Sequence, residues 1–300
     1  MAMAVLQEMR DILLRHRPGD GIHPCALPRV SLVRSSETGE PMPVVYEPSL
    51  CLAVSGRKRV LIGDAGFVYD SAQYLVVSVD LPVTGMVVEA SADDPYLCLK
   101  LDLNVAVLSE LLPTHDARVP RGDHAPSIAV GEVAPAMRDT ALRLLRLLDT
   151  PDDIPALAPL IERELLYRLL TGPQGAMLRH IATADTHMHQ VSRAVAWIKD
   201  HYAGTFSIDH LAGLAGMSPS SFHEHFKSVT RFSPLQYRTR LRLLEARRLM
   251  VSDAMDAASA GFQVGYDSPS QFSRDYAKAF GMPPLRDAAR LRAMPVGLAG

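Results

Sequence analysis

Apolar and polar residues alternate in short runs along the first third of the chain, after an opening segment with a different period. Residues 3–16 place apolar side chains at helical spacing and stop before Pro18 and Gly19, which predicts a helix. From about residue 30 to residue 103 the runs are β-rich and are separated by turn signals such as Asp93-Asp94-Pro95. They cover residues 30–33, 44–46, 50–54, 59–62, 67–69, 74–79, 86–89 and 96–101. Eight short strands at this spacing predict an antiparallel sandwich or barrel.

The pattern becomes helical after Leu103. Residues 104–112 predict a short helix, and residues 135–149 and 155–171 predict a helical hairpin. The second hairpin helix carries an apolar stripe made of Leu157, Leu160, Ile161, Leu165 and Leu169. Such a stripe forms either internal core or an interface between subunits. Gly172 and Pro173 then break the pattern, so a linker or a bridging helix is expected up to about residue 189.

A repeat with an offset of fifty residues organises the C-terminal third. Ser218-Pro219-Ser220 recurs as Ser268-Pro269-Ser270, and each copy suits a helix start with serine at the N-cap and proline at the first helical position. A shorter apolar segment with a late glycine, Gly216 or Gly265, precedes each copy. The aromatic positions also repeat, with Phe222 matching Phe272 and Phe226 matching Tyr276. This order predicts two helix-turn-helix units, at about 207–230 and 256–280.

Several motifs occur in a fixed order within these units, between them and after them. They are Met217-Ser218-Pro219-Ser220, Phe226-Lys227, Ser233-Pro234-Leu235-Gln236-Tyr237, Leu244-Glu245-Ala246-Arg247-Arg248-Leu249, Val264-Gly265-Tyr266, Ser270-Gln271-Phe272-Ser273-Arg274 and Phe280-Gly281-Met282-Pro283-Pro284. Together they resemble the DNA-binding domain of the AraC/XylS family of bacterial transcription regulators. Residues 44–52, 56–60 and 74–83 resemble the N-terminal domain of one AraC subfamily.

This resemblance implies an α+β chain. Its N-terminal part is expected to be a cupin-like β-barrel plus a helical hairpin, followed by an all-α tandem helix-turn-helix DNA-binding domain. The expected boundaries are 1–172 for a sensor domain with dimerising helices, 173–189 for a linker and 190–292 for the DNA-binding domain.

The distribution of charge agrees with that division. The chain has a formal net charge of −2, but residues 190–300 carry 14 Lys and Arg against 9 Asp and Glu. A basic C-terminal part suits a domain that faces phosphates. No run of eighteen apolar residues occurs and residues 1–17 lack a signal-peptide pattern, so neither a membrane span nor a signal peptide is expected. Three cysteines without a CxxC spacing suit reduced thiols in a cytoplasm.

The exposed polar positions of the two capped helices are the expected DNA-binding residues. They are Ser220, Ser221, His223, Glu224 and Lys227 in the first unit, and Ser270, Gln271, Ser273, Arg274 and Lys278 in the second. Arg274 and Gln271 lead as base readers because their side chains match guanine and adenine edges, and His223 and Glu224 come next. Glu224 departs from the basic or amide residue common in the family: it can accept from a cytosine amine but repels phosphates. A further basic set either contacts phosphates or is solvated: Lys227, Arg231, Arg238, Arg240 and Lys278.

Five residues on the predicted strands are candidate ligand contacts: Tyr46, Cys51, Tyr69, Tyr74 and Cys98. Tyrosine hydroxyls suit the few polar anchors of an apolar pocket. The cysteines are either buried structural thiols or reactive thiols that capture an electrophile such as an aldehyde, and a reactive thiol needs a lowered pKa. Because Leu50 and Leu52 flank Cys51 and no cation is near it in the sequence, non-covalent binding is the favoured mechanism.

No chemistry of an enzyme or a metal site is predicted. The N-terminal histidines, which are His16, His23, His115 and His124, form no cluster with one another or with a glutamate. His187 and His189 in the expected linker are interpreted as solvated. No GxSxG, P-loop or GxGxxG motif occurs in the right context. We therefore expect no cofactor, no metal and no catalytic residue.

The sequence thus predicts a cytoplasmic, sequence-specific transcription regulator whose sensor domain binds an unknown small-molecule effector and controls promoter binding or activation. Its expected partners are a double-stranded DNA operator, a second copy of the chain in a homodimer and, for an activator, RNA polymerase; no membrane is involved. The alternative is a metal-free small-molecule binding protein whose helical domain makes protein contacts.

Overall fold

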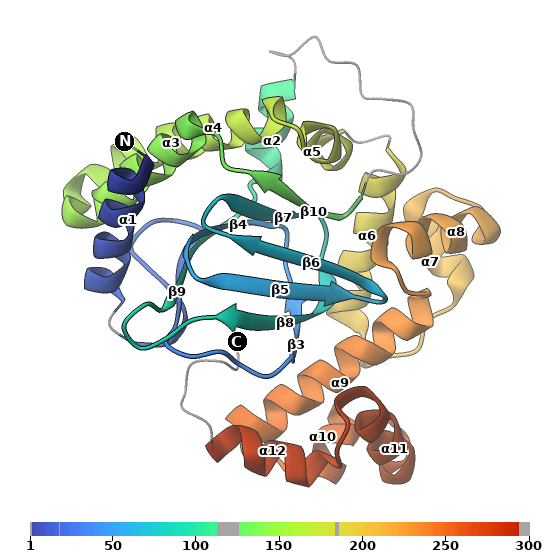
Figure 1. The fold of residues 1–300 in the computed structure, drawn as a ribbon. Helices are drawn as coiled ribbons and strands as arrows, with labels where there is room; N and C mark the ends of the chain where they lie inside the picture. Colours follow the sequence, from blue (N-terminus) through green and yellow to red (C-terminus); the bar gives the residue numbers. More distant parts are fainter. Residues whose placement is uncertain (1, 18, 113–125, 184–185, 294–300) are drawn as a thin grey trace.

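A computed structural model describes residues 2–17, 19–112, 126–183 and 186–293 (Figure 1). Two antiparallel sheets, which we call the sandwich, occupy the centre of the molecule. The helices coloured blue to green in Figure 1 cover one side of the sandwich, and the orange and red helices of the C-terminal third run along another side. The sandwich and the C-terminal helices are therefore in contact along an extended boundary.

The described strands form a six-stranded sheet in the order β1-β2-β9-β4-β7-β10 and a four-stranded sheet in the order β3-β8-β5-β6. Their bounds are β1 (Gly21–Pro24), β2 (Val30–Ser35), β3 (Met42–Tyr46), β4 (Ser49–Ser55), β5 (Arg57–Ile62), β6 (Ala65–Asp70), β7 (Gln73–Val77), β8 (Leu81–Glu89), β9 (Tyr96–Asp102) and β10 (Ile128–Glu132). The eight predicted runs correspond to β2–β9 and are confirmed. Strands β1 and β10 were not predicted, because both are short and form only by pairing with β2 and β7.

The predicted fold class is confirmed, but the two sheets do not close into a barrel. Within the described ranges no backbone pairing joins one sheet to the other. The chain crosses between the sheets at Gly56, whose φ of 71° lies in the left-handed region, and a Cβ there would stand 2.5 Å from the carbonyl oxygen of Glu89. This sharp corner ends the pairing of β4 and starts β5 in the opposite sheet. The cupin-like part is therefore a two-sheet sandwich held together by side chains.

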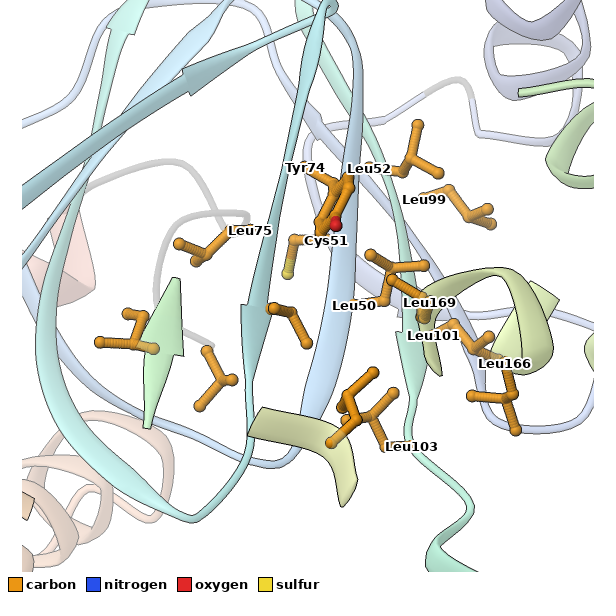
Figure 2. Packing of buried hydrophobic residues seen from close by; sticks show 14 of the residues in the cluster. Leu50, Cys51, Leu52, Tyr74, Leu75, Leu99, Leu101, Leu103, Leu166 and Leu169 are labelled. Atoms are coloured by element: carbon orange, nitrogen blue, oxygen red, sulfur yellow. The ribbon is translucent and has the colours of Figure 1, made fainter. Parts of the chain in front are cut away.

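Helices cover the outer face of the six-stranded sheet. They are α1 (Ala2–His16), α2 (Val105–Leu111), α3 (Pro135–Arg146) and α4 (Ile154–Thr171), and α3 and α4 form the predicted hairpin around short turns at 147–149 and 151–153. Figure 2 shows Leu50, Leu99 and Leu101 on the side of the sheet nearer to Leu166 and Leu169 of α4, and Cys51 and Leu75 on the other side. Adjacent residues of β4 therefore face different layers, as the period of two requires.

The C-terminal helices follow without a long irregular linker. Helix α5 packs against α2 and α4, so the expected linker at 173–189 contains a bridging helix and the start of α6. The bounds are α5 (Gly175–Ala182), α6 (His187–His201), α7 (Ile208–Ala215), α8 (Pro219–Thr230), α9 (Pro234–Ser252), α10 (Ala257–Gln263), α11 (Pro269–Phe280) and α12 (Pro284–Ala293). Among the helices described, none has both the length and the apolarity that crossing a bilayer requires.

Two hydrophobic cores divide the C-terminal helices. The buried residues of α7 and α8, such as Leu211 and Phe226, belong to one core that also contains the sandwich. The buried residues around α10 and α11, such as Val264 and Phe272, form a second core with the end of α9. Helix α9 takes part in both, because Leu241 belongs to the first core and Leu249 to the second.

Candidate nucleic-acid interface and ligand site

The first helix-turn-helix unit is made by α7 and α8. Gly216 ends α7 with a φ of 68°, a conformation that glycine adopts without strain. Ser218 begins α8, and its hydroxyl oxygen accepts a hydrogen bond from the backbone N–H of Ser221 at 3.3 Å. Phe222 and Phe226 are fully buried beneath α8. The opposite face of α8 is thereby fixed toward solvent.

The second unit, α10 and α11, repeats this construction. Asp256 begins α10, and its carboxylate accepts hydrogen bonds of 3.0 Å from the backbone N–H groups of Ala258 and Ser259. Hydrogen bonding to the Ser259 side chain, together with these backbone bonds, lowers the pKa of Asp256. Ser268 begins α11 by accepting from the N–H of Gln271. Phe272 and Tyr276 are buried, as their counterparts in α8 are. The predicted helix-turn-helix units are both present.

Helix α9 joins the two units and is anchored at both ends. It begins with a capping box in which Ser233 and Gln236 bond each other's backbone N–H groups. Halfway along, the guanidinium of Arg242 donates to the carbonyl oxygens of Tyr202 and Gly265, each at 2.7 Å. One side chain therefore ties the loop after α6 to the turn of the second unit, which fixes the two units relative to each other.

A buried ion-pair network locks the second unit onto α9. The fully buried carboxylate of Asp287 on α12 accepts from Arg247 Nε at 2.8 Å and from the hydroxyl of Tyr276 at 2.9 Å. Arg290 donates to the same carboxylate at 3.1 Å. Asp287 thus connects α9, α11 and α12. Sequence reasoning missed this role, because Asp287 looks like an ordinary acid within a basic segment.

The structure places the ten predicted DNA-binding residues on the solvent-facing sides of α8 and α11. Eight are exposed and two are half-buried, namely Ser221 and Ser273. Arg274, Lys227 and Lys278 form no ion pair with any described residue. These cations are therefore available to an external anion, and the two predicted groups lie on corresponding faces of two equivalent helices.

Of the other arginines considered from the sequence, Arg231 and Arg240 are exposed and Arg238 is half-buried. Arg238 lies over the ring of Phe206 at 4.9 Å, and Arg240 lies over the ring of Phe232 at 4.3 Å. Arg240 also lines a cleft with Leu61 and Pro82 of the sandwich. These contacts assign Arg238 and Arg240 to packing within the molecule, which leaves Lys227 and Lys278 as the better phosphate contacts.

Polar contacts join the sandwich to the first unit and to α6. Lys199 Nζ lies 2.6 Å from a carboxylate oxygen of Glu47 and 2.6 Å from one of Asp80. The hydroxyl of Tyr237 on α9 donates to the carbonyl oxygen of Asp80 at 2.9 Å. Ser127 donates to the carbonyl oxygen of Val229 at the end of α8. The recognition helix of the first unit is therefore linked directly to the sandwich.

A groove of about 510 Å³ lies beside these contacts, between β3 and the helices α6 and α9. Its apolar walls include Val44, Val45, Leu241 and Leu244. The lining residue Arg248 is paired with Glu245 at 2.9 Å, and Lys199 is paired as described above. The groove is thus an apolar cleft with neutralised charges at its rim, and nothing in the sequence pattern indicated it.

Four of the five candidate ligand residues converge between the two sheets. Cys51 pairs with Lys100 and Cys98 pairs with Ala53, so both thiols lie on the inner face of the six-stranded sheet. Tyr69 from β6 reaches across and accepts a hydrogen bond of 3.1 Å from the hydroxyl of Tyr96. Burial raises the pKa values of both tyrosines well above their ordinary range, so they stay neutral.

Tyr74 does not join this cluster. Its partners across the sheet are Leu52 and Gly131, which place it on the face covered by helices. A Cβ at Gly131 would lie 2.4 Å from the Tyr74 ring, so glycine is needed there for the ring to pack. Tyr74 is therefore a packing residue of the outer layer, and its burial raises the pKa of its hydroxyl.

The sequence reasoning missed Lys58, which belongs to the inner cluster. Its Nζ lies 5.5 Å from the ring centroid of Tyr46 and 5.8 Å from that of Tyr96. A Cβ at Gly85 would stand 3.3 Å from the Tyr46 hydroxyl and 3.4 Å from Lys58 Cε, so Gly85 leaves room for both side chains. Although no cation is close to Cys51 in the sequence, Lys58 therefore brings one into the same inner cluster. Alternation could have revealed it, because Lys58 has the same parity as the buried Val60 and Ile62.

Comparison with known families now gives a decisive match. The family described as "AraC-type transcriptional regulator N-terminus" matches residues 26–177, and the family described as "Helix-turn-helix domain" matches residues 211–290. The first match alone covers half of the chain. The chain belongs to the AraC-type transcriptional regulators.

Curated relatives match less than half of this AraC-type chain. The HTH-type transcriptional regulator ExsA of Pseudomonas aeruginosa is 30% identical over 132 residues, which are 44% of this chain and 47% of ExsA. The HTH-type transcriptional activator RhaS of Escherichia coli is 26% identical over 136 residues, which are 44% of this chain and 46% of RhaS. The chain thus matches about half the length of these relatives.

Solved structures of ToxT from Vibrio cholerae share the fold of the AraC-type chain over most of its length. ToxT bound to (E)-4-(8-methylnaphthalen-1-yl)but-3-enoic acid has a TM-score of 0.59 at 10% identity, covering 87% of this chain and 98% of ToxT. ToxT bound to an unsaturated fatty acid has a TM-score of 0.52 at 10% identity, covering 87% and 93%. At this identity the likeness establishes the fold alone.

The described residues hold no group of three or more His, Cys, Asp or Glu side chains that could bind a metal ion. His115 and His124 lie outside the described residues. Of the pair at the start of α6, His187 stacks near His225 of α8 with ring centroids 3.8 Å apart, and His189 Nδ1 lies 3.1 Å from the carbonyl oxygen of Ile181. Both are therefore engaged in helix packing, contrary to the solvated interpretation.

Proposed function

We propose that the chain is a sequence-specific DNA-binding transcription regulator, controlled by a small organic molecule that binds its N-terminal part. The observation that carries this proposal is the pair of equivalent capped helices, α8 and α11, with exposed polar faces held by one connecting helix. Membership of the AraC-type family supports it, as does similarity to the transcriptional regulators ExsA and RhaS. A regulator that binds bacterial DNA acts in the cytoplasm, and we propose no catalytic role.

In this proposal Arg274 and Gln271 read base edges in the major groove, with His223 and Glu224 as further readers. Lys227 and Lys278 contact phosphates, and the exposed serines of both helices support these contacts. We assign residues 1–172 to sensing, 173–189 to the connection and 190–292 to DNA binding. RNA polymerase is a further partner if the protein activates.

We also propose that α4 pairs two subunits in a homodimer. Leu157 and Leu160 are 42% and 64% exposed, and Tyr167 on the same helix is 42% exposed. Large apolar side chains gathered on one helix surface favour an interface. The rest of the predicted stripe, including Ile161 and Leu165, is buried within the subunit and serves the core.

The small-molecule part of the proposal rests on the sandwich. ToxT, which has this fold, binds a naphthalenyl butenoic acid and an unsaturated fatty acid. We place the effector site at the inner cluster of Tyr46, Cys51, Lys58, Tyr69 and Cys98, where polar groups face an otherwise apolar interior.

Binding of the full-length protein to DNA tests the regulatory proposal. The probes are a fragment from upstream of its own gene and a scrambled fragment of equal length. Binding to each is measured by fluorescence anisotropy across a salt series. Arg274→Ala should weaken specific binding by about 5–150-fold, which corresponds to ~1–3 kcal/mol for one bidentate base contact, and should leave scrambled DNA nearly unaffected.

Lys227→Ala is the matched comparison. It should weaken both fragments about equally and reduce the slope of log affinity against log salt by about one unit. Equal losses on both fragments for Arg274→Ala would reassign Arg274 to phosphate. Absence of salt-dependent binding to either fragment would favour the alternative, a small-molecule binding protein whose helices contact another protein.

A further inference from the structure

Inside the sandwich, the thiols of Cys51 and Cys98 and the ammonium of Lys58 lie in one layer. Within the described part of the chain, no carboxylate pairs with this ammonium. Cys51 and Cys98 occupy diagonal positions on the neighbouring strands β4 and β9, on the face that looks toward the other sheet. Lys58 reaches into the same layer from β5, as its distances to Tyr46 and Tyr96 show. The cluster therefore combines two nucleophiles with a cation in an apolar layer.

The ammonium of Lys58 is paired differently from that of the neighbouring Lys100. Among the residues described, no carboxylate forms an ion pair with Lys58, whereas Lys100 at the edge of the cluster is bonded to Asp102. Burial disfavours the Lys58 ammonium, but Tyr46 and the two thiols offset this, and its pKa lies above the ordinary value. A thiolate at Cys51 would therefore act as a counter-ion for Lys58.

The two thiols differ in protonation. A hydrogen bond from Cys98, together with the charges of Lys58 and Lys100, outweighs burial and lowers the pKa of Cys51 to about 7. Burial raises the pKa of Cys98 well above its ordinary value. Cys98 therefore keeps its proton. Cys51 also has the more accessible side chain, at 6% exposed against 2% for Cys98.

We propose that Cys51 is a covalent capture site for small α,β-unsaturated carbonyl compounds, with Lys58 and Cys98 as positioning residues. The Cys51 thiolate forms a sulfur–carbon bond to the β-carbon, and the π electron pair of the carbon–carbon double bond moves toward the carbonyl oxygen. Lys58 faces that developing negative charge. The proton lost by the thiol ends on the α-carbon, so the net change is addition of S–H across the double bond without an oxidant or a reductant.

This inference deepens the proposed function by naming the chemical class of its effector, and only its regulatory consequence rests on that function. Cys51 lies in the core shared by the sandwich and the first helix-turn-helix unit. An adduct adds volume to a packed layer, which forces neighbouring side chains to move. Capture itself is measurable without any DNA, so its failure and failure of the proposed function are separate results.

The chain contains its own control, Cys25. Cys25 is more exposed than Cys51, yet burial raises its pKa. If exposure decides reactivity, Cys25 reacts first; if thiolate content decides, Cys51 reacts first. The full-length protein is treated with a limiting amount of methyl vinyl ketone, and adducts are located over time by peptide mass spectrometry. We expect Cys51 to be modified first, with a rate that rises with pH to a midpoint near 7.

Lys58→Met tests the positioning role, and circular dichroism confirms that the variant folds. It should move the pH midpoint of Cys51 modification upward by about one unit and slow the reaction at pH 7 by about fivefold. Cys51→Ser should abolish the fast phase and leave slow modification of Cys25. Faster modification of Cys25 than of Cys51, or an unchanged midpoint in Lys58→Met, would overturn the proposal.

Butan-2-one, the saturated analogue, separates covalent capture from reversible binding. It cannot add a thiol, so it should leave operator affinity unchanged while methyl vinyl ketone changes it. An equal response to both compounds would overturn covalent sensing and return Lys58 to a reversible ligand contact. Capture at Cys51 without any change in DNA binding would keep the site and remove its regulatory consequence.

Discussion

The two helix-turn-helix units share their sequence pattern, their serine caps and their buried aromatic residues, but they belong to different cores. The core of the first unit is continuous with that of the sandwich, whereas the second has a core of its own around Val264 and Phe272. Ser127 also donates a hydrogen bond directly to the carbonyl oxygen of Val229 in the first unit, and Tyr237 of α9 donates to the carbonyl oxygen of Asp80 in the sandwich. A change in the sandwich therefore reaches the first unit by packing within one core, and the second through α9 and through the ion pair between Glu40 and Arg290 of α12.

The candidate base-reading residues of the two units also differ. The second unit carries Gln271 and Arg274, which suit base recognition, while the first carries the acid Glu224. In the proposed function, the two equivalent helices therefore take unequal shares of coupling to the sandwich and of base recognition. Perturbing one unit at a time distinguishes these shares.

Asp287→Ala should have the largest effect and should fall on the second unit. It leaves Arg247, which is only 6% exposed, without a counter-ion, and breaking a buried pair in this way costs about 3–5 kcal/mol. The single tryptophan, Trp197, packs against Phe206 and His210 beside the first unit. We expect circular dichroism to show helix loss at lower denaturant than the Trp197 fluorescence change.

The exposed Asp267 offers the control, because Asp267→Ala removes an acid near the same unit without emptying a buried pair. It should keep the two probes coincident. If Asp287→Ala shifts both probes together by the same amount, the two units unfold as one and the division into separate cores carries no energetic meaning.

The two turn glycines should respond unequally to alanine. At Gly216 a Cβ would meet only Gln190 Nε2 at 4.0 Å, so Gly216→Ala should cost only the left-handed strain of about 1–2 kcal/mol. At Gly265 a Cβ would lie 2.0 Å from the carbonyl oxygen of Ala203, so backbone must move as well and the loss should exceed about 3 kcal/mol. Urea unfolding midpoints measure both. Equal losses would contradict the tighter closure of the second turn.

Lys199→Met should have the smallest effect and should be visible through pH. The hydrogen bond from Lys199 holds the pKa of Glu47 below its ordinary value of 4.5, so this contact stabilises the structure above that pH and its contribution is lost as pH falls through the lower, folded pKa. Because both side chains are partly exposed, the contribution is ~0.2–1 kcal/mol. The Trp197 fluorescence midpoint in urea, measured between pH 3 and pH 6, should fall in acid more for the wild type than for Lys199→Met. Parallel pH profiles would exclude a role for this pair.

The C-terminal elements could be predicted closely because their signals are local. Ser218-Pro219 and Ser268-Pro269 mark helix starts that the structure places at the same residues. The hydrogen bonds of Arg242 and Asp287 could not be predicted, since each joins segments 11 to 40 residues apart through side chains that look like ordinary surface charges.

In the sandwich, strands were predictable and their faces only in part. The run Arg57-Lys58-Arg59 looks like a solvated basic segment, although Lys58 shares the parity of Val60 and Ile62, and its register beside Val87 and Tyr69 turns Lys58 inward. Tyr74 was grouped with Tyr46 and Tyr69 because all three lie on strands, but pairing with Leu52 turns it to the helix-covered face. Which side of a sheet a residue faces depends on partners distant in the chain, and single-sequence patterns do not contain them.

Helix α9 has a consequence for the DNA that such a protein can accept. Its 19 residues span about 28 Å at 1.5 Å per residue, comparable to the ~34 Å repeat of the double helix. One inserted residue would rotate the far unit by about 100° around the α9 axis. In a protein with this helix, the two helix-turn-helix units keep a fixed separation and rotation. An extra base pair between their target sites therefore cannot be accommodated. The operator would have to evolve as one block of fixed length.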